Sequence, residues 1–268
     1  MAAPILVTGG TGTLGRLVVL RLRDAGYDVR VLSRSSHQGR LGVEFVTGDL
    51  GTGEGIEAAV AAAEVVVHCA GTTKGDEVKA RHLVRAAARA GTRHLVYISV
   101  VGADRIPVVS GIDRAMFGYF RSKLAAEQVI AESGLPWTTL RATQFHDLIL
   151  MTMEQLAKMP VIPVPAGFRF QPVDTAEVAT RLGELALAAP AGPVPDMGGP
   201  QVYELTELVR SYLQVRGKRR PILPIRVPGR AARAFREGAN LTPEHAVGRR
   251  TWEDFQAARV ETPTERPR

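Results

Sequence analysis

The chain has 268 residues, 45% hydrophobic and 23% charged, and this balance is that of an ordinary globular protein, which excludes a disordered one. Its net charge of +7 comes from scattered arginines, and the only dense run, 216–220, has no interleaved aromatic residues, so we interpret it as a solvated face and expect no nucleic-acid partner. No apolar run reaches the length of a membrane-spanning helix, and the first residues lack a signal-peptide pattern, so we expect no membrane contact.

Over the first 140 residues, short β-rich runs alternate with helical patterns. The runs that predict strands are 4–8, 28–33, 43–47, 64–69, 93–99 and 136–140. Apolar residues at helical spacing predict a helix that begins near Leu14, and further helices at 57–63, 76–90 and 114–133. Strands that alternate with helices over short connections pair in parallel, so we predict an α/β fold with a Rossmann-type doubly wound parallel sheet.

After residue 140 the pattern becomes less regular. The predicted helices are 151–159, 174–188 (capped by Asp174 or Thr175), 204–216 and 229–238. We interpret 141–260 as a smaller C-terminal region attached to the sheet within one domain, 1–260. Residues 261–268 are polar and contain proline, and are predicted to be a flexible tail.

The segment 8–15 lies between the first predicted strand and the first predicted helix, and its glycines follow the spacing G-x-x-G-x-x-G. Gly9 would let the chain turn sharply, Gly12 would leave room for a pyrophosphate, and Gly15 would let the helix lie close to the sheet. The free N–H groups and the positive end of the helix would hold the phosphates, whereas a turn without a ligand is the alternative. The residues assigned to cofactor binding here are Thr8, Gly9, Gly10, Thr11, Gly12, Thr13, Leu14 and Gly15.

The end of the second predicted strand distinguishes the two nicotinamide cofactors. NAD binders usually have a carboxylate about 20 residues beyond the glycine loop, and this chain has none there. Arg34 would instead bind a 2′-phosphate with the hydroxyls of Ser33 and Ser35, although an arginine at a strand end can also be merely solvated. The sequence therefore favours NADP over NAD, with 1–140 as the cofactor part and 141–260 as the substrate region.

Several motifs indicate a family. The glycine loop, Arg34, Gly48-Asp49-Leu50 and His68-Cys69-Ala70-Gly71 together resemble the short-chain dehydrogenase/reductase superfamily. Further stretches make nearly the whole chain similar to its atypical NmrA-like, NAD(P)H-binding branch. These stretches are 97–104, 119–127, 140–145, 171–174 and 250–255.

The resemblance implies where the remaining cofactor contacts lie. It places Asp49 and Leu50 beside the adenine, although Asp49 is almost as well explained as a turn or cap residue. It places Ala70 and Gly71 along the cofactor ribose, and 141–145 beside the nicotinamide.

Tyr119 and Lys123 form a Y-x-x-x-K pair, which places both side chains on one face of a helix. An ammonium beside a phenol favours the phenolate and would lower the pKa of Tyr119, so that Tyr119 could transfer a proton during hydride transfer. The resemblance implies that Lys123 also holds the nicotinamide ribose. Such a spacing also arises by chance on many helices, and the position after the fifth strand favours the catalytic interpretation.

One departure from the superfamily concerns the serine or threonine that orients the substrate carbonyl. By alignment to the family pattern, Val101 fills that position, and Ser99, Ser110 and Ser122 are weak substitutes. His146 would either face the substrate or be an ordinary packed or surface histidine.

Methionines 151, 153 and 159 and their apolar neighbours would form either a lid over a planar or hydrophobic substrate, or ordinary core. Cys69, the only cysteine, is predicted to be a small buried filler in the fourth strand. A single cysteine excludes an intramolecular disulfide and favours a reducing cytoplasm, and no Cys or His cluster has metal-ligand spacing.

These patterns predict an NADP-dependent oxidoreductase, monomeric or homodimeric, that reduces a small carbonyl or quinone-like substrate, with Tyr119 and Lys123 as the catalytic residues. The alternative is a non-catalytic NADP-binding redox sensor, which the missing hydroxyl at Val101 favours. A nucleotide-sugar epimerase or dehydratase is a weaker third hypothesis.

Overall fold

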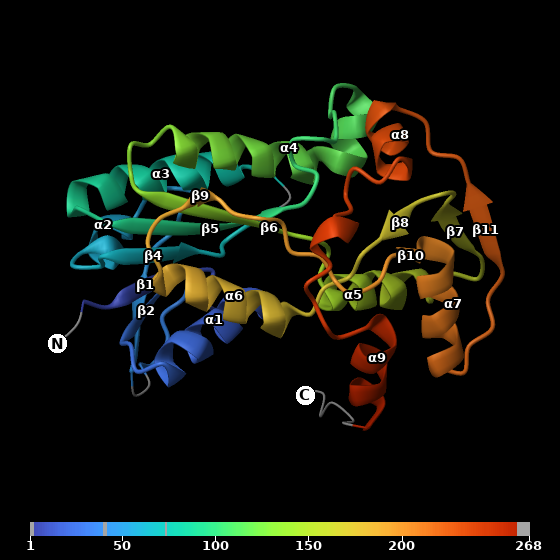
Figure 1. Cartoon of the computed structure of the whole chain (residues 1–268), viewed down its shortest axis with the longest axis horizontal. Coiled ribbons are helices and arrows are strands. Elements are labelled where there is room, and N and C mark those ends of the chain that lie inside the picture. Colours follow the sequence, from blue (N-terminus) through green and yellow to red (C-terminus); the bar gives the residue numbers. More distant parts are fainter. Residues whose placement is uncertain (1–2, 40–41, 73, 262–268) are drawn as a thin grey trace.

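The computed structural model describes residues 3–39, 42–72 and 74–261 of the chain. Its centre is a parallel sheet of seven strands in the order β3-β2-β1-β4-β5-β6-β9 (Figure 1). The predicted Rossmann-type sheet is therefore confirmed. The strands are β1 (Ile5–Thr8), β2 (Val29–Ser33), β3 (Val43–Thr47), β4 (Val65–His68), β5 (His94–Val100), β6 (Trp137–Ala142) and β9 (Gly192–Pro193).

Apolar residues on both faces of the central strands explain why helices cover the sheet on both sides (Figure 1). One face packs against α1 (Thr13–Asp24) and α6 (Thr175–Leu187). The other face packs against α2 (Ile56–Val60), α3 (Asp76–Ala90) and α4 (Gly111–Ala131). After β3 the chain crosses β1 and β2 to form β4, so the strand order changes direction between β1 and β4, where open α/β sheets bind their ligands.

The C-terminal region forms a third apolar core beside the end of the sheet, under two small two-stranded sheets, β10-β8 and β11-β7 (Figure 1). Its centre is aromatic: the Phe235 ring lies 4.7 Å from the Phe168 ring and 5.7 Å from the Phe117 ring of α4. The elements of this region are α5 (His146–Leu156), β7 (Ile162–Pro165), β8 (Arg169–Phe170), β10 (Tyr203–Glu204), α7 (Leu205–Val215), β11 (Ile222–Ile225), α8 (Arg230–Arg236), a 3₁₀ turn (Pro243–His245) and α9 (Trp252–Glu261).

Some boundaries differ from the prediction for identifiable reasons. Helix α4 begins earlier because the Ser110 hydroxyl accepts from the Asp113 N–H at 3.0 Å and Asp113 in turn accepts from the Ser110 N–H, a capping box. Helix α5 covers 146–156 rather than 151–159, and the proline-containing segment 161–167 includes β7. The predicted tail, 261–268, lies outside the described residues beyond residue 261.

Candidate cofactor and active site

The glycine loop leaves the carboxyl end of β1 and turns directly into α1. Gly9 has a φ of +71°, and a Cβ there would lie 2.7 Å from the backbone nitrogen of Ala70, so only glycine fits between the loop and the end of β4. Gly12 is the N-cap of α1, and its N–H donates to the Gly9 carbonyl at 2.9 Å. The sharp turn that Gly9 was predicted to permit is therefore present.

Gly15 has a different neighbour from the one we predicted. A Cβ at Gly15 would overlap the carbonyl oxygen of Gly9, so its close contact is with the loop rather than with the sheet. Contact with the sheet is made by Gly10, where a Cβ would lie 2.8 Å from Cγ1 of Val31 in β2. The loop therefore packs closely against α1 on one side and against the sheet on the other.

The amino end of α1 is open to an anion. Because the N-cap is a glycine, no side chain bonds the first turn of α1, and that turn contains no acidic residue. The N–H groups of Thr13, Leu14 and Gly15 lie in this first turn, where helical partners are lacking. This arrangement fits the pyrophosphate of a dinucleotide.

The end of β2 presents a cation. Arg34 is exposed and makes no hydrogen bond or ion pair with any other described residue. The Ser33 hydroxyl is already engaged, because it accepts from the Ser35 N–H at 3.2 Å and lies 3.0 Å from Nε2 of His37. Of the predicted 2′-phosphate ligands, the guanidinium of Arg34 and the hydroxyl of Ser35 are therefore the groups without a hydrogen-bond partner among the described residues.

Asp49 and Leu50 form a turn after β3. The Asp49 carboxylate accepts from the Gly51 N–H at 2.7 Å, which is the turn role that the sequence left open. Leu50 is buried, and its carbonyl accepts a hydrogen bond from Nδ1 of His82 at 2.8 Å.

Lys123 reaches the segment after β4 from α4. A Cβ at Gly71 would lie 2.9 Å from Nζ of Lys123, so glycine leaves the space that the ammonium occupies. The side chain is buried, and Nζ lies 3.4 Å from Oδ2 of Asp76 and donates to the Ile98 carbonyl at 3.3 Å. Burial lowers the pKa of Lys123, but Tyr97 and Asp76 outweigh it, so the net shift is upward and the ammonium stays charged.

Tyr119 is half-exposed one turn before Lys123, and Nζ lies 5.8 Å from the centre of its ring. Burial and the negative charge of Asp76 raise the pKa of Tyr119, so the predicted lowering by Lys123 is wrong. The reason is that the ammonium faces Asp76 and the buried Tyr97 ring rather than the Tyr119 hydroxyl.

Two of the three substitute hydroxyls, those of Ser110 and Ser122, are already bonded within the fold. Val101 is buried, and its N–H donates to the Ala142 carbonyl at 3.0 Å. Ser110 caps α4, and the Ser122 hydroxyl accepts from the Asp76 N–H at 3.1 Å. The Ser99 hydroxyl is buried without a hydrogen-bond partner among the described residues.

His146 is packed rather than facing a substrate. It is fully buried and stacked on Phe255 at 4.9 Å, and burial lowers its pKa to about 4. Cys69 follows β4 instead of lying within it and is only partly buried, and burial raises the pKa of its thiol to about 12. Of the methionines, Met153 is core, whereas Met151 and Met159 are exposed.

The sequence analysis gave no role in the site to three buried residues, Asp76, His68 and Tyr97. Oδ1 of Asp76 accepts from the Thr72 N–H at 2.8 Å, while Oδ2 faces Lys123. Nδ1 of His68 lies 2.7 Å from the Thr8 hydroxyl oxygen, and the His68 ring stacks on Tyr97 at 5.2 Å. Burial lowers the pKa of His68 to about 3. An acidic residue at a helix start is ordinary, so nothing in the sequence marked Asp76 as the partner of Lys123.

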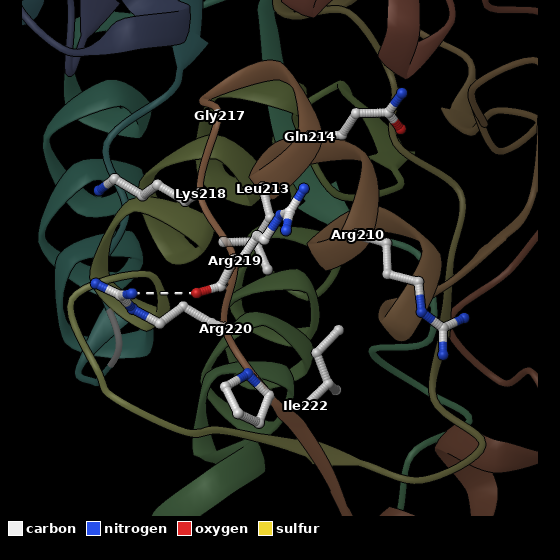
Figure 2. A pocket seen from close by; sticks show the side chains of 9 residues that line it. Arg210, Leu213, Gln214, Gly217, Lys218, Arg219, Arg220 and Ile222 are labelled. Carbon is white, nitrogen blue, oxygen red and sulfur yellow. Dashed lines mark hydrogen bonds between the residues drawn. The ribbon is translucent and has the colours of Figure 1, made fainter.

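A groove of about 900 Å³ lies at the other end of the molecule, between α7 and β11, and none of the predicted site residues lines it (Figures 1 and 2). Arg219 and Arg220 are exposed there, and Arg220 donates to the Arg219 carbonyl at 3.1 Å (Figure 2). Exposure of this run fits the solvated face that we predicted. In the described part of the chain, each helix is too short or too polar to cross a membrane.

A (4-alkanoyl-5-oxo-2,5-dihydrofuran-3-yl)methyl phosphate reductase from Streptomyces griseus is 35% identical over 144 residues, which are 53% of this chain and 48% of that protein. The chain therefore spans about half the length of this relative.

Two solved structures share the fold over nearly their whole length. The NADPH-dependent quinone oxidoreductase of Escherichia coli, complexed with NADPH, has a TM-score of 0.79 at 18% identity, covering 96% of this chain and 99% of that one. The triphenylmethane reductase of Citrobacter sp., complexed with NADP(H), has a TM-score of 0.74 at 21% identity, covering 95% of this chain and 99% of that one.

The family model for NAD(P)H-binding proteins matches residues 9–155, more than half of the chain. This range begins in the glycine loop and includes the Tyr119–Lys123 pair, so it contains most of the site described above. The chain therefore belongs to the NAD(P)H-binding family.

Proposed function

We propose that the chain is an NADP-dependent oxidoreductase that reduces a small carbonyl or quinone-like compound by hydride transfer. The observation that carries the proposal is a continuous line of contacts at the carboxyl edge of the sheet. The glycine loop touches Ala70 through Gly9, and the next residue, Gly71, touches Lys123. The proposed phosphate-binding loop and the proposed catalytic Lys123 thus both contact the segment Ala70-Gly71.

The preference for NADP rests on the end of β2. Arg34 is exposed there without a partner among the described residues, and the sequence provides no carboxylate to bind the ribose hydroxyls of NAD. The Escherichia coli and Citrobacter proteins were both crystallised with the phosphorylated cofactor, which supports the same choice.

A bound nicotinamide cofactor would supply the hydride. Tyr119, whose raised pKa keeps the phenol protonated, donates a proton to the substrate oxygen, so that a carbonyl becomes an alcohol. Lys123 remains charged beside Gly71, where it would hold the cofactor ribose and stabilise the negative charge that develops on the substrate oxygen. A protonated phenol suits the reductive direction.

Asp76 positions this machinery. One oxygen holds the Thr72 N–H just beyond Gly71, and the other faces the Lys123 ammonium. The carboxylate therefore fixes the ribose segment and the lysine relative to each other, and supplies the negative charge that a buried ammonium requires.

The test has two steps. Titration with NADPH and NADH, followed by cofactor fluorescence, is expected to show tighter binding of NADPH. NADPH consumption is then measured over a panel of carbonyl compounds and quinones, and a Tyr119→Phe variant is expected to bind NADPH normally but to lose most turnover. A Tyr119→Phe variant as fast as the wild type would remove Tyr119 from the mechanism.

A second candidate is a sensor that binds NADP without turnover, and the apolar Val101 at the usual hydroxyl position favours it. Tight NADPH binding, no turnover on the whole panel and a stable complex with a protein partner would establish this function instead.

A further inference from the structure

The first half of α4 exposes a line of large apolar side chains that leads to Tyr119. Ile112 is 53% exposed and Met116 is 50% exposed, and both stand before Tyr119 in the same helix. Residues 112, 116, 119 and 123 follow the spacing i, i+4, i+7, i+11, so these side chains lie along one face of the helix. The exposed apolar line therefore ends at the proposed proton donor and at Lys123.

An adjacent face of the same helical segment is covered. Phe117 and Phe120 are buried, and their rings lie 5.7 Å and 6.1 Å from Phe235 of α8. Packing between α4 and the C-terminal core therefore does not require Ile112 or Met116, and it leaves them exposed on the side that carries Tyr119. Val109, just before the helix, is also exposed.

We propose that Ile112 and Met116 bind the apolar substituent of the substrate, so that the substrate is a carbonyl compound with an extended hydrocarbon tail. This inference rests on the proposed function, because it takes Tyr119 as the point at which the carbonyl oxygen lies. Tyr119 stands seven positions after Ile112 in the helix, so the line is about 10 Å long and matches an alkyl chain rather than a compact substrate.

The charge around the line agrees with this class of substrate. Asp113, the acidic residue of this helical turn, is buried, and its carboxylate is occupied by the N–H groups of Ser110 and Ala231. An uncharged tail could therefore lie along the line without meeting an unpaired carboxylate from this turn.

The experiment uses the full chain and straight-chain 2-ketones of increasing length. Burial of each methylene is worth about fourfold in affinity, so kcat/KM is expected to rise by up to that factor per carbon until the chain passes Ile112. An Ile112→Ser, Met116→Ser double variant is expected to flatten this rise. For the shortest ketones, its kcat/KM is expected to fall by less than twofold.

Binding without turnover provides a second readout. Calorimetry of the corresponding 2-alkanols with the NADPH-loaded protein, where both partners are already reduced, is expected to show the same dependence on chain length, lost in the double variant. Leu187→Ser, which changes an exposed apolar residue at the end of α6, is the matched control and is expected to behave as the wild type.

Failure of this inference is distinguishable from failure of the proposed function. If Tyr119→Phe abolishes turnover but the double variant keeps the full dependence on chain length, the tail site is wrong and the reductase stands. If the double variant instead dissociates a dimer in sedimentation, a second copy of the chain covers the line and the inference is overturned.

Discussion

The half of the molecule from β1 to β6 and the C-terminal region bury apolar residues in different ways. In the first half, two cores lie on the two faces of one sheet. Neighbouring strands and helices supply most of both cores in regular alternation, and α6 completes one of them. In the C-terminal region, the core gathers side chains such as Phe117, Phe168 and Phe235 from distant parts of the sequence under short strands. The first region repeats a strand–helix unit, which appears in the sequence as periodic apolar residues, whereas the second depends on individual contacts between distant side chains. Mutations in the two regions should therefore have separable effects on stability and on cofactor binding.

The largest effect is expected in the aromatic core. Phe235 contacts Phe168, Phe170, Phe117 and Phe120, so Phe235→Ala leaves a cavity and should cost about 4 kcal/mol of unfolding free energy. Urea denaturation measures this loss. If the regions are separable, the folded variant still binds NADPH with wild-type affinity; weakened binding at low urea would show that the regions are coupled.

Asp76→Asn tests the first half of the molecule. The amide can still accept from the Thr72 N–H, but Lys123 loses its buried counter-charge, so stability should fall by about 3 kcal/mol and turnover should fall with it. Adding Lys123→Met removes the unpaired charge and should restore stability without restoring turnover. Glu77→Gln, next on the same helix, is the control. If Asp76→Asn has a wild-type pH–rate profile, Asp76 does not position Lys123.

Two helical glycines form a matched pair. Gly15→Ala places a methyl group against the Gly9 carbonyl and should weaken NADPH binding on the order of 100-fold, or ~2.7 kcal/mol. Gly118→Ala meets nothing within 4 Å in α4 and should stabilise the protein by about 0.5–1 kcal/mol without changing NADPH affinity. Equal affinities in fluorescence titrations of the two variants would refute the assignment of the loop.

The pH dependence of stability should have a source in the C-terminal region. Burial lowers the pKa of His146 to about 4. As the pH falls below about 6.5, this imidazole is therefore protonated in the unfolded chain while it stays neutral in the folded one. The contribution is complete above pH 6.5 and is lost as the pH falls towards 4. At pH 5 the loss of unfolding free energy amounts to about 2 kcal/mol. Between pH 7 and pH 5, the unfolding free energy of His146→Phe, measured by urea denaturation, should fall by about 2 kcal/mol less than that of the wild type. Identical losses in the two proteins would contradict a neutral buried imidazole.

The smallest effect concerns cofactor choice. Arg34→Ser removes the exposed guanidinium and should lower the preference for NADPH over NADH about tenfold, or ~1.4 kcal/mol, with stability unchanged. The ratio of the two dissociation constants is the measurement. Arg181→Ser, an exposed arginine on α6, serves as the control, and an unchanged ratio in Arg34→Ser would assign the 2′-phosphate to another residue.

The outcome of sequence prediction follows the same division. Strands β1 to β6 were predicted because a short β-rich run between helical patterns is a local signal, even where the strand, like β3 at the sheet edge, is not fully buried. Strand β9 was missed because it consists of Gly192 and Pro193 and pairs with only two residues of β6. The glycine loop could be located by its spacing, and the actual contact of Gly15 could not, because it depends on how the loop folds back.

The residues around Lys123 show most clearly which contacts could not be predicted from the sequence. Tyr119 lies one turn away and was found by spacing, whereas Asp76 and Tyr97 reach Lys123 from other elements of the fold. The predicted direction for the pKa of Tyr119 was therefore wrong, since the shift comes first from burial in the fold and then from the charge of Asp76, 43 residues earlier in the sequence.

Helix α4 belongs to both regions at once. Phe117 and Phe120 anchor its first half in the aromatic core, and Ala126 and Ile130 anchor its second half against the sheet, with Tyr119 and Lys123 around the junction. One residue inserted between the two anchors would rotate one half by about 100° relative to the other and turn one anchor into solvent. A chimera that grafts the C-terminal part of another family member must therefore preserve the phase of this helix through the junction.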